Sequence, residues 1–379
     1  MTRHSRLLEL LRSSPAYQAS QMSYVDRGVA DVEPFPFSAI EGQYEMKLAL
    51  MLAIINPLVG GVLLLGPRGT AKTTAVRSLT DLLPSVRRSL CPEGCTEEIL
   101  EEGGMAAICD DCAQKAGYGE PLSTMERVRL VNLPLNARLE DVVGGIDERL
   151  ALEQQRVRLE RGLLAQADEH ILYIDEVNML GKAIADAILD AAAQGFYTVR
   201  RGPQKLTYNS RFLLVGSMNP EEGTLRPQLM DRFGLRAVVR GLSDPDARYR
   251  AYVRATWYRR DPEGMAAAYA EQTLALADEV QAARERLDGV HIGDDARREG
   301  LRLIQNLAIQ SNRAEITLFE ASRAHAAADR RELVTPEDVS AVAHIALRFR
   351  SKDLGSFFQE QEAEDSRLHE LLAASEADE

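Results

Sequence analysis

GVLLLGPRGTAKTTAVRSLTDLLP, residues 61–84, is the stretch that decides the fold of this 379-residue chain. Val62–Leu65 is a short apolar run, which predicts a buried strand. The glycine-containing loop 66–73 follows, and beyond it apolar residues recur at helical spacing until Pro84. A strand, a glycine loop, a Lys-Thr pair and a helix in this order form the setting that a phosphate-binding P-loop requires.

The loop itself predicts how a nucleotide would be held. Backbone N–H groups and the start of a helix attract phosphate oxygens. We expect Lys72 to reach the β- and γ-phosphates and the Thr73 hydroxyl to hold Mg²⁺. Ala71 stands where glycine is commonest, and we expect its methyl group to be tolerated with a negative φ. The predicted nucleotide-binding residues of the loop are Gly66, Gly69, Thr70, Ala71, Lys72, Thr73 and Thr74.

A second apolar run ends in two acids. Ile171–Ile174 predicts a strand, and Asp175 and Glu176 follow it directly, in the form of a Walker B motif. Asp175 is expected to hold Mg²⁺, mostly through water, and Glu176 to orient and polarise the attacking water. Acids at strand ends are common by chance, but downstream of a P-loop they indicate a nucleoside triphosphatase.

Composition and charge exclude several classes of protein. The chain is 45% hydrophobic and 27% charged, which is typical of globular proteins. No apolar run approaches the roughly 20 residues of a membrane span, and no secretory signal is evident. We therefore expect a cytoplasmic protein without membrane contact. The net charge of −13 disfavours broad nucleic-acid binding, although a local basic loop could still touch DNA.

The four cysteines are clustered in one segment with the pattern C-x₃-C, a spacer and C-x₂-C. Paired thiolates at such spacing can close a tetrahedral zinc site. Redox-active disulfides and unligated thiols are the alternatives. A catalytic cysteine is disfavoured because no histidine base is nearby in the sequence. The candidate zinc ligands are Cys91, Cys95, Cys109 and Cys112.

The order of the remaining signals predicts an α/β fold. Further strand patterns occur at 128–135, 211–217 and 237–239, a hairpin pattern lies within 196–208, and helical patterns lie between them. Alternating strands and helices favour a parallel sheet with helices on both faces. From about residue 243 the strand patterns stop and helices follow. We expect an N-terminal extension (1–30), a nucleotide-binding core (31–242) with a four-cysteine insertion (about 88–118), an all-helical domain (243–350) and an acidic tail (351–379).

Several longer motifs resemble one family. FPFSAIEGQ at 35–43, EMKLAL at 45–50, ILYIDEVN at 171–178 and NPEEGTLRPQLMDRFG at 219–234 are similar to the ATPase (I-type) subunit of magnesium chelatase. That subunit is an AAA+ ATPase of the chelatase and MoxR-like branch. The resemblance extends from about residue 35 to 345, and it implies an AAA+ P-loop core followed by a helical lid.

The resemblance also implies roles and partners. Such subunits use ATP and Mg²⁺ and form rings, usually hexamers. They drive a D-type partner with a von Willebrand A domain and a large subunit that inserts Mg²⁺ into protoporphyrin IX, or a related metal into a tetrapyrrole. Asn219 matches the sensor-1 position, Arg232 the arginine finger and Arg313 the sensor-2 arginine. Ile40 and Gly42 match the segment that packs the adenine, with ordinary core packing as the alternative.

Some features depart from the family pattern and leave other functions open. Ala71 replaces a glycine, the four-cysteine insertion is absent from the best-known I subunits, and we expect no room for the C-terminal domain of a D-type subunit. A MoxR-like chaperone that remodels a partner protein would use the same ATPase residues. A nucleotide-binding scaffold without turnover and a DNA-remodelling AAA+ protein are further alternatives. A neighbouring gene for a large chelatase subunit would favour the chelatase.

Overall fold

The computed structural model describes residues 33–91, 93–145, 161–201, 204–223 and 225–350. The predicted N-terminal extension, residues 146–160 of the predicted core and the acidic tail lie outside the described residues. The predicted α/β architecture is confirmed by a parallel sheet of five strands in the order β4-β5-β8-β1-β9. These strands are β1 (Gly61–Leu65), β4 (Leu130–Leu133), β5 (Ile171–Ile174), β8 (Leu213–Met218) and β9 (Phe233–Val238).

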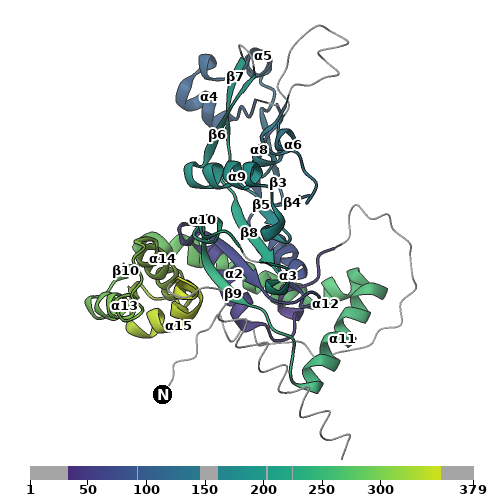
Figure 1. The fold of residues 1–379 in the computed structure, drawn as a ribbon. Helices are drawn as coiled ribbons and strands as arrows, with labels where there is room; N and C mark the ends of the chain where they lie inside the picture. The colour runs from purple at the N-terminus through teal and green to yellow at the C-terminus, as the bar shows by residue number, and fades with distance from the viewer. Residues whose placement is uncertain (1–32, 92, 146–160, 202–203, 224, 351–379) are drawn as a thin grey trace, which may run out of the picture.

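The interior strand β1, which lies between β8 and β9, is buried on both faces because its residues alternate between two cores. Val62 and Leu64 belong to one hydrophobic cluster, and Leu63 and Leu65 belong to the other. Every residue of β1 is buried, which explains its continuous apolar run. The sheet is thus a middle layer between two layers of helices, as Figure 1 shows.

Different helices cover the two faces of the sheet. The cluster around Val62 and Leu64 takes in α2 (Tyr44–Ile55), α3 (Lys72–Ser78) and the C-terminal helices between residues 262 and 347. The cluster around Leu63 and Leu65 takes in the helices on the other face, which are α6 (Leu139–Val143), α8 (Leu163–Gln166), α9 (Lys182–Gln194) and α10 (Pro227–Met230).

The expectation for the last strand was too short. β9 begins at Phe233, ahead of the 237–239 expected from the sequence. Arg236 interrupts the apolar pattern, yet it is buried within the strand and donates to the carbonyls of Met230, Arg348 and Phe349. A charged residue in the sequence normally indicates an exposed position, so the pattern did not predict a buried strand residue here. Arg236 can be buried because backbone carbonyls accept hydrogen bonds from its guanidinium.

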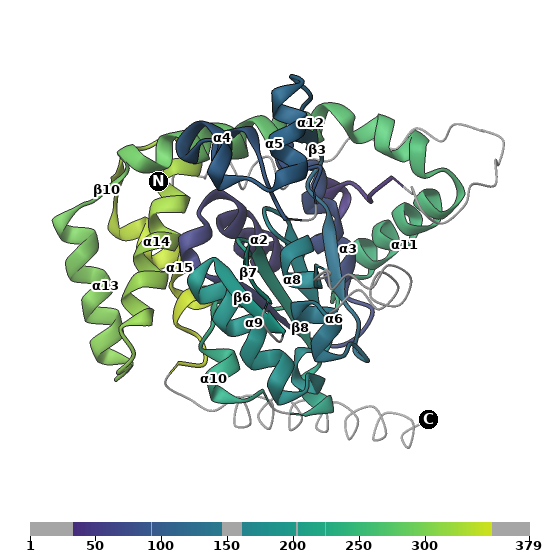
Figure 2. The ribbon, with the colours of Figure 1, turned by 90° about the horizontal axis from the view of Figure 1, so that it is seen from above.

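The C-terminal region is helical, as predicted, with one exception. Its two short strands, β10 (His291–Ile292) and β11 (Leu333–Val334), pair in parallel. Figures 1 and 2 both show α11 on the side of the molecule opposite α13. The helices of this region are α11 (Pro245–Arg260), α12 (Pro262–Arg286), α13 (Asp294–Asn306), α14 (Arg313–Ala328) and α15 (Pro336–Leu347).

Two antiparallel strand pairs stand apart from the central sheet (Figure 1). The predicted hairpin is confirmed as β6 (Phe196–Arg201) paired with β7 (Gln204–Asn209). β2 (Val86–Ser89) pairs with β3 (Ser123–Glu126), and the segment between them carries the four cysteines. Two helices lie within that segment, α4 (Glu97–Gly103) and α5 (Asp110–Gly117).

Candidate nucleotide site at the carboxyl edge of the sheet

The P-loop leaves the carboxyl end of β1 and enters α3, as predicted. A Cβ at Gly66 would lie 2.0 Å from the carbonyl oxygen of Val239, so only glycine allows this approach of two backbones. Gly69 has a φ of +79°. The expectation for Ala71 was wrong: its φ is +65°, in the left-handed region. The chain must turn there to enter α3, a conformation that costs an L-residue about 1–2 kcal/mol.

Lys72 is buried at the start of α3 and folds back onto the loop. Its ammonium group donates to the carbonyl oxygens of Gly66 and Pro67, each at 2.7 Å. Burial lowers the pKa of Lys72, and the nearby Asp175 carboxylate opposes that shift. The ammonium group therefore lies inside the loop. On nucleotide binding, phosphate oxygens would replace the two carbonyl oxygens as its hydrogen-bond acceptors.

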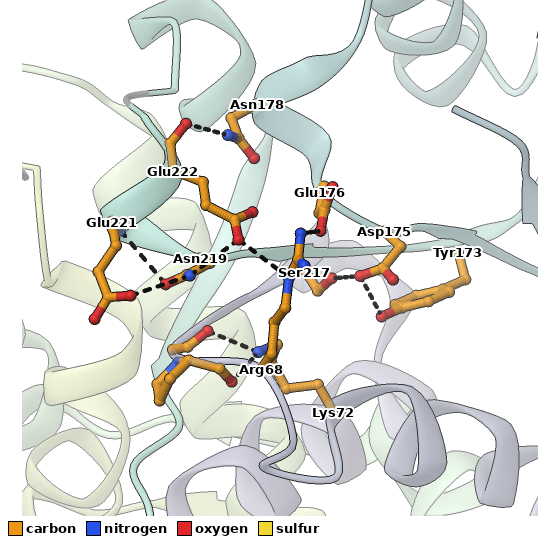
Figure 3. A network of polar contacts seen from close by, with 12 residues as sticks. Arg68, Lys72, Tyr173, Asp175, Glu176, Asn178, Ser217, Asn219, Glu221 and Glu222 are labelled. Carbon is orange, nitrogen blue, oxygen red and sulfur yellow. Dashed lines mark hydrogen bonds and ion pairs between the residues drawn. The ribbon is translucent and has the colours of Figure 1, made fainter. Parts of the chain in front are cut away.

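Tyr173 joins the two predicted Mg²⁺ ligands. Its hydroxyl lies 3.0 Å from Thr73 Oγ1 and donates to Asp175 Oδ1 at 3.2 Å. Ser217 Oγ also donates to Asp175 Oδ1 (Figure 3). Hydroxyl and carboxylate oxygens are the donors that Mg²⁺ prefers. The residues present therefore fit a Mg²⁺ ion carried with a nucleotide, with Thr73 and Asp175 as the groups that would hold it.

Glu176 is engaged by an arginine of the P-loop. Arg68 Nη2 lies 2.5 Å from Glu176 Oε1, and Arg68 Nε lies 3.0 Å from Glu222 Oε1. Figure 3 shows the Arg68 side chain reaching from the P-loop to the two carboxylates. Because 71% of the Arg68 side chain is exposed, both ion pairs are weak and can be exchanged.

Asn219 lies just beyond β8, beside the acids of the Walker B strand, as its sequence position predicts. It is buried, and its amide donates to Glu221 Oε2 at 3.4 Å and Glu222 Oε1 at 3.3 Å. Since β1, β5 and β8 are adjacent and parallel, their carboxyl ends meet at one edge. The structure therefore brings Lys72, Thr73, Asp175, Glu176 and Asn219 to the same edge of the sheet.

A cavity of about 590 Å³ lies beside the P-loop and extends to α11. Ile40 lines it together with Thr70, Ala71 and Thr74. Gly42 does not line the cavity. A Cβ built at Gly42 would lie 2.8 Å from Cδ2 of Leu242, and Leu242 does line the cavity. The cavity continues the phosphate loop toward the segment that was expected to pack a base.

The two predicted arginines lie elsewhere. Arg232 immediately precedes Phe233, and Phe233 pairs with Gly61, the first residue of β1. It therefore stands at the amino edge of the sheet, whereas the P-loop follows the carboxyl edge. Arg313 Nη1 donates to the carbonyl and the carboxylate of Asp231, both at 3.0 Å. The structure thus brings Arg313 next to the Arg232 segment and not to the P-loop of its own chain.

Comparisons with known proteins bear on the same residues. The family model for magnesium chelatase, subunit ChlI, matches residues 149–232, which include Asp175, Glu176, Asn219 and Arg232. A magnesium-chelatase subunit ChlI homologue of Methanocaldococcus jannaschii is 42% identical over 318 residues, covering 84% of this chain and 86% of that protein. The chain belongs to the ChlI family of magnesium-chelatase subunits.

Further similarities agree with membership of the ChlI family. The chloroplastic subunit ChlI-2 of Arabidopsis thaliana is 39% identical over 317 residues, covering 83% of this chain and 75% of that protein. An AAA lid domain model matches residues 302–371. A solved structure of a putative ATPase from Cytophaga hutchinsonii has a similar fold, with a TM-score of 0.53 at 17% identity, covering 82% of this chain and 83% of that one. The predicted AAA+ fold with a C-terminal lid is confirmed.

Sequence reasoning missed the side chains that position the ChlI-family site. Tyr173 and Ser217 hold Asp175, and Arg68 holds Glu176. Each occupies a position at which the sequence motif specifies no residue type, either in the loop or inside a strand. Tyr173 and Ser217 could have been found from the sequence, because each places a hydroxyl in an otherwise apolar strand that ends at the site. A buried hydroxyl requires a hydrogen-bond partner.

Outside the nucleotide site, the structure also brings the four cysteines together. Their Sγ atoms all lie within 4.8 Å of one another, and all four are free thiols. Among the described residues of this ChlI-family chain, no helix is both long and apolar enough to cross a bilayer.

Proposed function

We propose that this chain is the ATP-hydrolysing motor subunit of a metal chelatase, which drives Mg²⁺ into protoporphyrin IX or a related metal into a tetrapyrrole. One observation carries the proposal. The Tyr173 hydroxyl joins Thr73 of the P-loop to Asp175 of the Walker B strand, and Glu176 and Asn219 lie at the same edge. A ChlI-family chain with this edge complete has the groups that ATP hydrolysis requires.

The protein's own side chains have separate tasks. Lys72 would exchange its bonds to Gly66 and Pro67 for phosphate oxygens, and Thr73 and Asp175 would hold Mg²⁺. When bound, that ion neutralises charge on the β- and γ-phosphates. Glu176 orients the attacking water after its carboxylate parts from Arg68. Asn219 contacts the γ-phosphate or that water from the end of β8.

The site is completed by a second copy of the chain. Arg232 lies at the far edge of the sheet, roughly 13 Å from the P-loop edge over the length of β1. This position supports a role for Arg232 at the nucleotide of a neighbour in a ring, and Arg313 is bonded to the preceding residue, Asp231. We propose a homo-oligomeric ring, with a hexamer as the expected form.

The proposed partners follow from family membership. A ChlI-type subunit works with other subunits, which we take to be a D-type partner with a von Willebrand A domain and the large subunit that inserts the metal. The proposed location is cytoplasmic. ATPase turnover and porphyrin metalation, measured with the cognate large subunit and D-type partner added, test the whole proposal.

Glu176→Gln tests the hydrolytic step. The variant should bind ATP with wild-type affinity and hydrolyse it at least roughly 100-fold more slowly, because only the water-polarising carboxylate is lost. Glu271→Gln is the matched control, since Glu271 is exposed on α12 and should retain turnover. Wild-type turnover by Glu176→Gln would contradict the assignment.

A further inference from the structure

The four cysteines converge from separate parts of the insertion between β2 and β3. Cys91 follows β2, Cys95 precedes α4, Cys109 caps α5 and Cys112 lies in its first turn. Cys91, Cys95 and Cys112 are buried and Cys109 is half-buried. Turns and two short helices thus bring four sulfur atoms into one group although 21 positions separate the first cysteine from the last.

Backbone N–H groups point at the sulfur atoms. The amide of Cys95 donates to Cys91 Sγ at 3.3 Å, and the amide of Cys109 donates to Cys95 Sγ at 3.3 Å. The Ser89 hydroxyl adds a third donor, 3.5 Å from Cys91 Sγ. Donors around a sulfur atom stabilise its thiolate, which is the form that binds metals.

The insertion has only a small hydrophobic core of its own. Apart from the cysteines, its buried hydrophobic side chains among the described residues are Ile108 and Leu122. A segment with so small a core does not bury enough apolar surface to offset its conformational entropy, and such segments depend on a disulfide or a metal. All four thiols are free, so no disulfide links these parts of the insertion. A bound metal ion is the remaining cross-link that would stabilise it.

The geometry points to a structural Zn²⁺ ion held by Cys91, Cys95, Cys109 and Cys112. Zinc–sulfur bonds of about 2.3 Å in a tetrahedron place sulfur atoms roughly 3.8 Å apart, so the observed cluster needs only a small contraction. Four thiolates close the coordination sphere and leave no position for water. The site is therefore structural, and it is separate from the Mg²⁺ of the proposed ATPase.

The zinc would fix one wall of a large cavity. The insertion and the base of the β6–β7 hairpin line a space of about 1210 Å³, and Cys91 and Gly94 are among its lining residues. A Cβ at Gly94 would lie 2.8 Å from Nη2 of Arg161, so Gly94 packs closely against that guanidinium. Loss of zinc should loosen this wall and leave the P-loop unchanged.

Metal content of the full chain tests the inference. Protein purified without chelator should contain about one zinc per chain by elemental analysis. After removal of zinc, titration with Co²⁺ should give the thiolate charge-transfer and visible bands of a tetrahedral sulfur site. A metal-free, folded preparation with four reduced thiols would overturn the inference, and so would disulfides found by mass spectrometry.

Cys112→Ser against Asp111→Asn provides the matched comparison. Cys112→Ser should lose most of the zinc and exchange amide hydrogen faster over residues 93–115, with ATP binding retained. Asp111→Asn changes an exposed neighbour and should keep a full complement of zinc. Equal zinc in the two variants would overturn the assignment. If Cys112→Ser does not fold, the stoichiometry and the Co²⁺ spectrum of the wild type still decide.

Discussion

The two edges of the central sheet differ in how many of the groups that bind a nucleotide they bring together. At the carboxyl edge, Lys72, Thr73 and Asp175 are already linked or buried within one chain. At the amino edge, Arg313 is bonded to Asp231, which precedes Arg232 in the chain, and the P-loop lies at the opposite edge. The difference supports the proposed ring, in which one chain provides the P-loop half of the site and Arg232 of a neighbouring chain provides the other half.

The amino edge is also easier to rearrange. The Arg313–Asp231 ion pair is 3.0 Å long, but its side chains are 39% and 41% exposed. Such pairs contribute about 0–1 kcal/mol, because water screens them and ordering two side chains costs entropy. A pair this weak can be exchanged, so Asp231 does not prevent Arg313 from taking the sensor-2 role that the family resemblance implies.

Lys72→Ala should have the largest effect on the carboxyl edge. It removes the charged donor inside the loop, and a charged hydrogen bond contributes about 1.5–3 kcal/mol. ATP affinity, measured by calorimetry, should fall roughly 10- to 100-fold and turnover should be lost. The control Lys182→Ala removes an exposed lysine from α9 and should bind normally. Unchanged affinity in Lys72→Ala would refute the P-loop assignment.

Tyr173→Phe should have a smaller effect that is confined to the metal. The change removes the hydroxyl that joins Thr73 and Asp175 and keeps the buried ring. The Mg²⁺ concentration for half-maximal turnover should rise roughly 10-fold, as for other groups that orient metal ligands. Affinity for ATP without Mg²⁺ should not change. Tyr208→Phe is the same deletion on β7, and an equal Mg²⁺ shift in it would sink the explanation.

Ala71→Gly should have the smallest effect, and it should stabilise the protein. Glycine removes the cost of a φ of +65°, and its greater freedom in the unfolded chain offsets part of the gain. The net change should be about 0.5–1 kcal/mol, seen as a rise in melting temperature without nucleotide. Ala75→Gly, within α3, should lower the melting temperature instead. A lower melting temperature in Ala71→Gly would show that the loop is not strained there.

The sequence predicted the carboxyl edge because its signals are local. The P-loop and Asp175–Glu176 each combine an apolar strand with polar residues that follow at once. Long-range packing limited the rest. The bond from Arg313 to Asp231 joins residues 82 positions apart and depends on how the lid packs on the sheet. The early start of β9 was hidden by Arg236, whose partners come from other segments.

The most direct test of a site shared between chains mixes two inactive variants. Arg232→Ala keeps its P-loop and should bind ATP but lose turnover, since an arginine finger contributes roughly 10³–10⁵ in rate. Lys72→Ala lacks a functional nucleotide site of its own but keeps Arg232. The control Arg297→Ala removes an exposed guanidinium from α13 and should stay active. Mixed oligomers of Arg232→Ala and Lys72→Ala, confirmed by mass, should regain part of the wild-type turnover. No recovery at any ratio would contradict the account.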